Sequence, residues 1–228
     1  MTMRLKAIVA AATALTVAAV FATVASIGSA SSNHADTMAG MAKMSHATAG
    51  PTASDLRALL GRQLGEHAAL AMNATNLGVK GSPAFPSAAK ALDRNSVELS
   101  QSIGSVYGKA AGNTFLNGKF MWRDHIKFFV NYTVALAKGD KAGQAKAVAN
   151  LKQYTVTFGG FLATATGLPK LAVQNDLLGH VLELKNQLDA YAGGKYALAA
   201  TDYRAAYAHM FMTGDLLAGA IAKQKHLS

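Results

Sequence analysis

Apolar side chains recur every three or four residues through most of the chain after position 54, which is the spacing of one face of an α-helix. Short breaks rich in glycine and proline interrupt this periodicity. The breaks fall at 78–86, at 108–113, at Gly139-Asp140, at Gly167 and at Gly193-Gly194. Runs of alternating apolar and polar residues that are typical of strands do not interrupt the pattern. The sequence therefore predicts an all-α fold of six helices.

The spacing of the breaks groups the six helices into pairs joined by short connections. Short connections favour antiparallel neighbours, so we expect three antiparallel helical hairpins at 54–107, 113–166 and 169–223. The first helix of the middle hairpin is expected to run without interruption over 113–138. Together the hairpins form a bundle-like domain over 54–226. Whether they close on one another or stack in a row is left open by the sequence.

A short polar pattern recurs once in each predicted hairpin: an asparagine follows a histidine by six residues. The three pairs are His67 and Asn73, His125 and Asn131, and His180 and Asn186. This recurrence favours one helical unit used three times. Residues six apart lie ~120° from each other around a helix, so the His and the Asn of one pair face different neighbours.

Two interpretations of the recurring histidines are open. Buried polar groups are usually hydrogen-bonded to their neighbours. In the first interpretation, the His and Asn side chains therefore form polar contacts between helices. Imidazole is also a common transition-metal ligand, and His67, His125 and His180 stand at equivalent heights in three helices. If the hairpins close, these rings converge on one metal site, to which His209 of the last helix is a candidate fourth contributor.

The first 30 residues have the features of a secretory signal peptide. Arg4 and Lys6 form a charged start, an apolar stretch follows from Ala7, and Gly28-Ser29-Ala30 offers small residues for cleavage. We therefore expect an exported protein, periplasmic or extracellular, with no transmembrane segment after cleavage. Residues 31–53 are expected to form a flexible linker, because they lack the large aliphatic side chains needed for a core.

Histidine and methionine are concentrated in this linker. The residues concerned are His34, Met38, Met41, Met44 and His46. Thioether sulfur is a soft ligand for Cu(I), and imidazole binds copper in both oxidation states. The tract resembles the methionine-rich tracts of bacterial periplasmic copper-handling proteins, a resemblance that implies a copper-binding segment. A low-complexity linker in which the methionines are incidental is the alternative.

Composition narrows the classes of partner and fold. The chain has no cysteine, so a lipobox and a disulfide framework are excluded, and stability must come from a packed core. It carries 22 basic residues against 12 acidic ones, and these are scattered. An excess of positive charge favours an anionic surface or an acidic envelope protein as a partner. The absence of a combined basic and aromatic binding pattern argues against nucleic acid.

Catalytic motifs are missing from the sequence. A di-iron carboxylate bundle needs about four carboxylates with Glu-x-x-His pairs, whereas this chain has three glutamates and no such pair. A Gly-x-Ser-x-Gly nucleophile motif and a phosphate-binding Gly-x-x-x-x-Gly-Lys loop are also missing. We therefore expect a non-enzyme. The favoured function is binding of a transition metal, preferably copper, and the alternative is a structural or interaction module of the cell envelope.

Three segments of the helical region resemble uncharacterised secreted bacterial proteins. They are Glu66-His67, Trp122 to Ile126, and Tyr207 to Gly214. Some of the proteins that carry similar segments are named for a copper amine oxidase N-terminal-like domain. The resemblance spans roughly residues 55–225 and implies that the histidines belong to the identity of the fold. It implies no activity, because the amine oxidase catalytic machinery is absent from this sequence.

Overall fold

The computed structural model describes residues 52–228, and this part of the chain is helical and contains no strand. The all-α, bundle-like fold predicted from the apolar periodicity is confirmed. The helices are α2 (Ala53–Val79), α3 (Phe85–Tyr107), α4 (Lys109–Asn117), α5 (Trp122–Lys138), α6 (Lys141–Thr166), α7 (Lys170–Ala192) and α8 (Tyr196–Lys225). None of these helices is both long enough and apolar enough to cross a bilayer.

Local side-chain chemistry fixes where several helices begin and end. Thr52 and Asp55 form a capping box at the start of α2, in which each side chain accepts a hydrogen bond from the other residue's backbone N–H. Gly139 ends α5 in the left-handed region at φ 69°. Asp140 follows directly and caps α6 by accepting the Gly143 N–H at 2.9 Å. The turn between α5 and α6 therefore needs only two residues.

The prediction of a single helix over 113–138 is wrong. The chain instead forms α4 and α5 in this region, with a turn between them. Phe120 in this turn has a positive φ of 55°, which costs a residue with a Cβ ~1–2 kcal/mol. The carboxylate of Asp124 accepts the Phe120 N–H at 2.7 Å and so satisfies a backbone donor ahead of α5. Apolar periodicity is insensitive to such a break, since both helices keep an apolar face toward the core.

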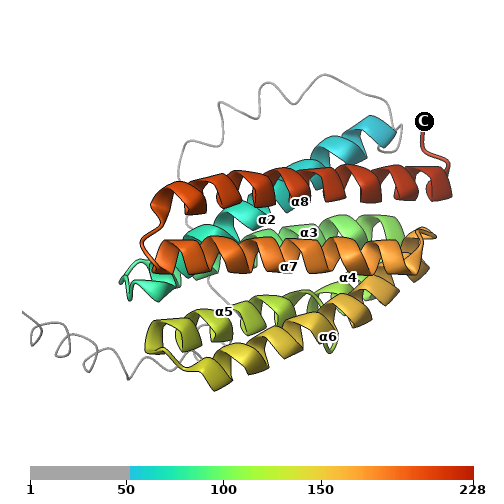
Figure 1. Ribbon diagram of the computed structural model, residues 1–228. Helices are drawn as coiled ribbons and strands as arrows, with labels where there is room; N and C mark the ends of the chain where they lie inside the picture. The colour runs from blue at the N-terminus through green and yellow to red at the C-terminus, as the bar shows by residue number, and fades with distance from the viewer. Residues whose placement is uncertain (1–51) are drawn as a thin grey trace, which may run out of the picture. The chain divides into compact units, whose positions relative to one another are not determined.

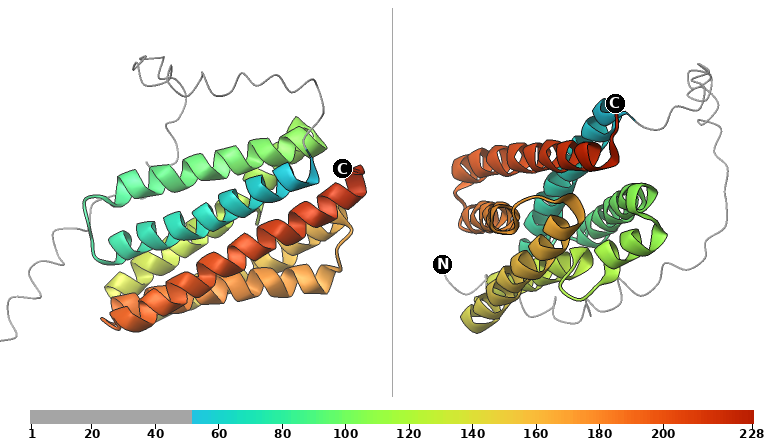
Figure 2. Two further views of the ribbon diagram at one scale, coloured as in Figure 1. Left: turned by 90° about the horizontal axis from the view of Figure 1, so that it is seen from above. Right: turned by 90° about the vertical axis from the view of Figure 1, so that its right-hand side faces the viewer.

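The three hairpins close on one another instead of stacking in a row. α2 packs on α3 within its own hairpin and also contacts α5, α7 and α8, while α6 contacts α7. Each hairpin therefore touches both of the others (Figure 1). In the view from above in Figure 2, α2 lies between α3 and α8. The first helices of the three hairpins, α2, α5 and α7, meet on the inside of the bundle.

The antiparallel helices α2 and α8 approach closely at glycines. A Cβ added at Gly214 of α8 would lie 2.7 Å from the Leu60 carbonyl oxygen and 2.8 Å from the Gly61 Cα. Gly61 and Gly65 of α2 in turn receive the rings of Phe211 and Tyr207. Residues with side chains at these positions would push the two backbones apart. This contact explains a glycine within α8, where it lowers helix propensity by ~1 kcal/mol relative to alanine.

Candidate metal centre

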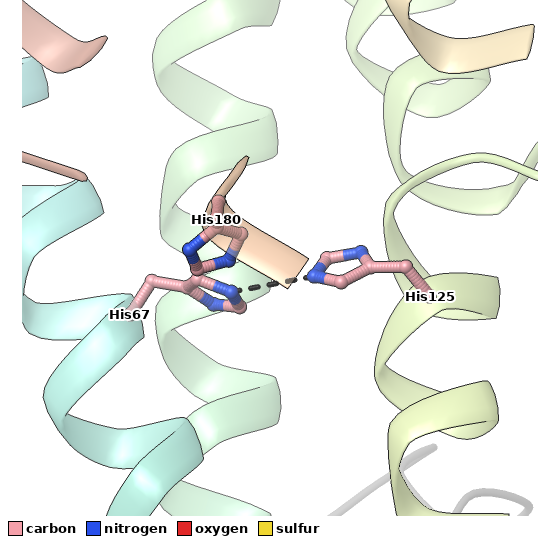
Figure 3. Close-up of side chains that lie close together, drawn as sticks. All are labelled: His67, His125 and His180. Atoms are coloured by element: carbon pink, nitrogen blue, oxygen red, sulfur yellow. Dashed lines mark hydrogen bonds between the residues drawn. The ribbon is translucent and has the colours of Figure 1, made fainter. Parts of the chain in front are cut away.

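His67, His125 and His180 are buried at the centre of the bundle, on α2, α5 and α7 respectively. Their exposed fractions are 1%, 5% and 2%. The three rings point toward one another from three different helices (Figure 3). From the sequence, we expected these rings to converge only if the hairpins close. The hairpins do close, and the rings converge. We refer to His67, His125 and His180 as the histidine trio.

The spacing of the ring nitrogens in the histidine trio suits one small ion. The Nε2 atoms of His67 and His125 are 3.3 Å apart, and one nitrogen of each of the three rings lies within 4.8 Å of the others. Two nitrogens bound to one tetrahedral zinc ion at ~2.05 Å lie ~3.3 Å apart. The distance between the His67 and His125 nitrogens is thus already that of two ligands of one ion. The distances from these nitrogens to that of His180 need to shorten by at most about 1.5 Å.

Aromatic side chains form much of the wall around the histidine trio. The centroid of the Trp122 ring lies 4.6 Å from that of His67 and 4.8 Å from that of His125. Tyr154 stacks on His125 at 4.5 Å between ring centroids, with an interplanar angle of 21°. No carboxylate belongs to the group of converging ligand atoms. The site therefore offers uncharged imidazole nitrogens in an apolar, aromatic surrounding.

Hydrogen bonding satisfies the histidine trio only in part. The Nδ1 atoms of His67, His125 and His180 are buried without a hydrogen-bond partner. A buried polar atom without a partner costs ~1–3 kcal/mol. If the rings were purely packing elements, three such costs would remain uncompensated beside a single His67–His125 contact. An ion bound at the Nε2 atoms of His67 and His125 would leave their Nδ1 atoms without a partner, so the bonds to the ion itself would have to offset this cost.

Burial keeps all three imidazoles in their uncharged form. It lowers the pKa of His67 and His180 well below the usual value of 6.5, and neighbouring histidines add to the effect. Burial also lowers the pKa of His125 to about 3, and the charge of His180 adds to this. The Trp122 backbone has the opposite, smaller effect on this pKa. Metal ligands must be deprotonated, so protons do not compete for this site near neutral pH.

His209 does not join the histidine trio as a fourth member. Its ring lies between α8 and α7, where Nδ1 is 2.7 Å from Glu183 Oε2 and Nε2 is 3.2 Å from Asp176 Oδ1. Both carboxylates raise the pKa of His209 to about 9, with Asp176 the larger cause, against an opposing effect of burial. His209 is thus engaged by two carboxylates outside the convergence point.

The asparagines of the recurring pattern are not buried between helices, although one interpretation expected them there. Asn73, Asn131 and Asn186 are exposed. Their ~120° offset from the histidines places them on the solvent side of helices whose histidines face the core. The packing hypothesis is therefore wrong for the asparagine half of the pattern.

The histidines and methionines of the linker, His34, Met38, Met41, Met44 and His46, lie outside the described residues. The signal peptide expected over 1–30 lies outside them as well.

The sequence analysis did not identify the residues that surround the histidine trio or those that bind His209. Trp122 precedes His125 by three residues and therefore shares its helix face, which is a signal that the sequence contains. Asp176 and Glu183 stand four before and three after His180 on α7, and this spacing likewise places them on neighbouring stripes. Tyr154 of α6 gives no comparable signal, because only the tertiary contact between α5 and α6 brings it to His125.

Comparisons with protein-family models, with curated proteins and with solved structures found no match for this chain. The resemblance to secreted bacterial proteins stays an expectation. The functional argument consequently rests on the geometry of the histidine trio.

Proposed function

We propose that this chain is an exported helical protein that holds one transition-metal ion, preferably copper, among His67, His125 and His180. The observation that carries the proposal is the convergence of three buried, uncharged imidazoles within 4.8 Å of one another. Imidazole binds zinc, copper, nickel and iron, so the ligand type alone leaves the metal open.

The charge of the surroundings favours Cu(I) over divalent ions. None of the converging ligands is a carboxylate, so the site keeps the full charge of its ion inside the core. The cost of burying an ion in a low-dielectric interior grows with the square of its charge, so a divalent ion costs about four times as much as a monovalent one.

The proposal includes a role for the linker and for the environment of the protein. The methionines and histidines of the linker would capture copper ions after export, and the basic surface would favour an anionic partner in the envelope. The protein would act as a metal-binding protein without catalysis.

Titration of the metal-free full chain with Cu(I), in competition with a colorimetric chelator, tests this function. We expect one ion to bind more tightly than about micromolar and to change the emission of Trp122. Trp122 is the only tryptophan, and its ring lies 4.6 Å from that of His67, so its emission reports on the histidine trio. His67→Gln, His125→Gln and His180→Gln should each abolish the response. His226→Gln, which changes an exposed histidine, is the matched control.

An unchanged Trp122 emission at saturating Cu(I), Cu(II) and Zn(II) would overturn the proposal. The alternative, a structural or interaction module of the envelope, would then stand. The His67–His125 contact and the stacking of Tyr154 on His125 favour that alternative, because both are interactions of metal-free packing.

A further inference from the structure

The His209 ring is held between two carboxylates of α7 that act on different nitrogens. Glu183 Oε2 lies 2.7 Å from Nδ1, and Asp176 Oδ1 lies 3.2 Å from Nε2. The two carboxylates hold the ring protonated near neutral pH, so in the metal-free protein Nδ1–H donates to Glu183 and Nε2–H donates to Asp176. A metal ion that binds Nε2 displaces the proton from this nitrogen and leaves Nδ1–H hydrogen-bonded to Glu183. A carboxylate on the second ring nitrogen is the usual way in which a metal-binding histidine is oriented.

Asp176 is itself oriented by a neighbouring side chain. The Thr213 hydroxyl donates to Asp176 Oδ2 at 3.0 Å, which leaves Oδ1 directed at His209. A nitrogen and an oxygen bound to one ion at ~2.0–2.2 Å lie about 3.3–3.6 Å apart in tetrahedral geometry. The hydrogen-bonded separation of 3.2 Å therefore needs to lengthen by only about 0.1–0.4 Å when an ion replaces the proton between the two atoms.

These ligands open onto the surface. Asp176, His209, Met212 and Thr213 line an open hollow of about 700 Å³ between α7 and α8. Met212 is 68% exposed and offers a thioether at this hollow. Asp215 also borders the hollow but pairs with Arg57 at 3.1 Å, so we do not count it as a ligand. Water has free access to complete the coordination of an ion here.

Gly179 explains how His209 reaches this position. A Cβ added at Gly179 would lie 3.1 Å from His209 Cε1. Because Gly179 has no side chain, the His209 ring of α8 can pack directly against α7 at this position. In the recurring pattern, Gly179 stands where Glu66 and Asp124 precede the other two histidines. The third unit thus lacks that carboxylate and has the His209 ring in its place.

We propose that His209 Nε2 and Asp176 Oδ1 form a second, solvent-exposed metal site that binds a hydrated divalent transition-metal ion, with Met212 as a further ligand and Glu183 as the positioning residue. An imidazole with a carboxylate suits zinc, nickel or Cu(II), and the negative charge of Asp176 lowers the cost of a divalent ion. The site is separate from the histidine trio, whose converging ligand atoms do not include His209. The two sites therefore differ in ligand charge and in access.

Zinc binding to the metal-free full chain, labelled with ¹⁵N at histidine, tests this site with each ring observed separately. We expect Zn²⁺ to shift the His209 ring resonances in a saturable manner. Asp176→Asn should weaken this response about tenfold, and Glu183→Ala about 10–100-fold, as found for residues that orient metal-ligating histidines. Glu183→Gln keeps an acceptor oxygen and should restore much of the affinity. His226→Gln should leave the response unchanged.

His209 resonances that stay unmoved up to millimolar Zn²⁺ would overturn this proposal, as would a folded Asp176→Asn variant that binds like the unaltered chain. In either case the Asp176–His209–Glu183 cluster serves only as an ionic contact between α7 and α8. Far-ultraviolet circular dichroism confirms that each variant is folded. Failure of the histidine trio to bind copper would be seen at Trp122 and would leave the zinc response at His209 in place.

Discussion

The Nε2 atoms of His67 and His125 lie 3.3 Å apart in the core, although 58 residues separate them in the chain. Two imidazoles this close repel when both are protonated, and burial adds to the cost of either charge. The pair is consequently uncharged near neutral pH. His180 completes the group from a third helix, and the three rings have few other polar partners.

Replacing one member of the histidine trio should separate its structural role from its metal-binding role. In the metal-free protein we expect His180→Leu to leave the free energy of unfolding unchanged within about 1 kcal/mol, because an apolar side chain removes a buried nitrogen that has no partner. Cu(I) at about 100 times its dissociation constant should stabilise the unaltered chain by about 2.7 kcal/mol and leave the variant unaffected. Urea unfolding with and without Cu(I) measures both quantities. A metal-free variant destabilised by about 3 kcal/mol or more would identify the ring as a packing element.

The close contact of α2 and α8 predicts opposite outcomes at two glycines of the same helix. Gly214→Ala should destabilise the protein by about 1–3 kcal/mol, since its Cβ would meet the Leu60 carbonyl oxygen at 2.7 Å and backbone cannot yield cheaply. Gly219→Ala is the control, because its Cβ would meet only the flexible Arg57 side chain at 3.5 Å. There we expect stabilisation of up to about 1 kcal/mol from improved helix propensity. Equal effects of the two substitutions in thermal unfolding would contradict the close approach.

Stability of the metal-free protein should carry a pH dependence that belongs to His209. Its pKa of about 9 lies above the usual 6.5, so the folded state binds the proton more tightly than the unfolded chain. The resulting stabilisation is fully present below about pH 6.5, declines as pH rises toward 9, and is absent above that value. Because the ring is half-buried, solvent screening reduces its size. Urea unfolding of the unaltered chain and of His209→Gln at several pH values should give a difference that narrows from pH 6 to pH 9. A constant difference would show that the charge of His209 does not contribute.

The turn between α4 and α5 should depend on Asp124. Asp124→Ala removes the acceptor of the Phe120 N–H and should cost about 1 kcal/mol, as the loss of a helix cap does. Asn131→Ala on the same helix changes an exposed residue and should stay within about 0.5 kcal/mol of the unaltered chain. Chemical denaturation of both variants measures the comparison. A substantial loss in Asn131→Ala would instead give the recurring asparagine a structural role.

Periodicity and turn chemistry in the sequence determined the helical class and the pairing of helices into hairpins. These properties follow from the spacing of residues within each helix, which is why they are readable locally. The spacing of residues did not predict the division of 113–138 into α4 and α5, because that division depends on a contact between the Asp124 carboxylate and Phe120. It also did not predict the position of the His209 ring, because Gly179 and two carboxylates of α7 hold this ring.

Only the tertiary structure decided that the three hairpins close and bring His67, His125 and His180 within 4.8 Å. Helix periodicity fixes the direction in which a side chain leaves its own helix. The distance between side chains of different helices depends instead on how the helices pack, and here that includes the close approach of α2 and α8 at Gly61 and Gly214. For this reason the sequence named the three histidines as candidates, whereas the closed bundle made them one group.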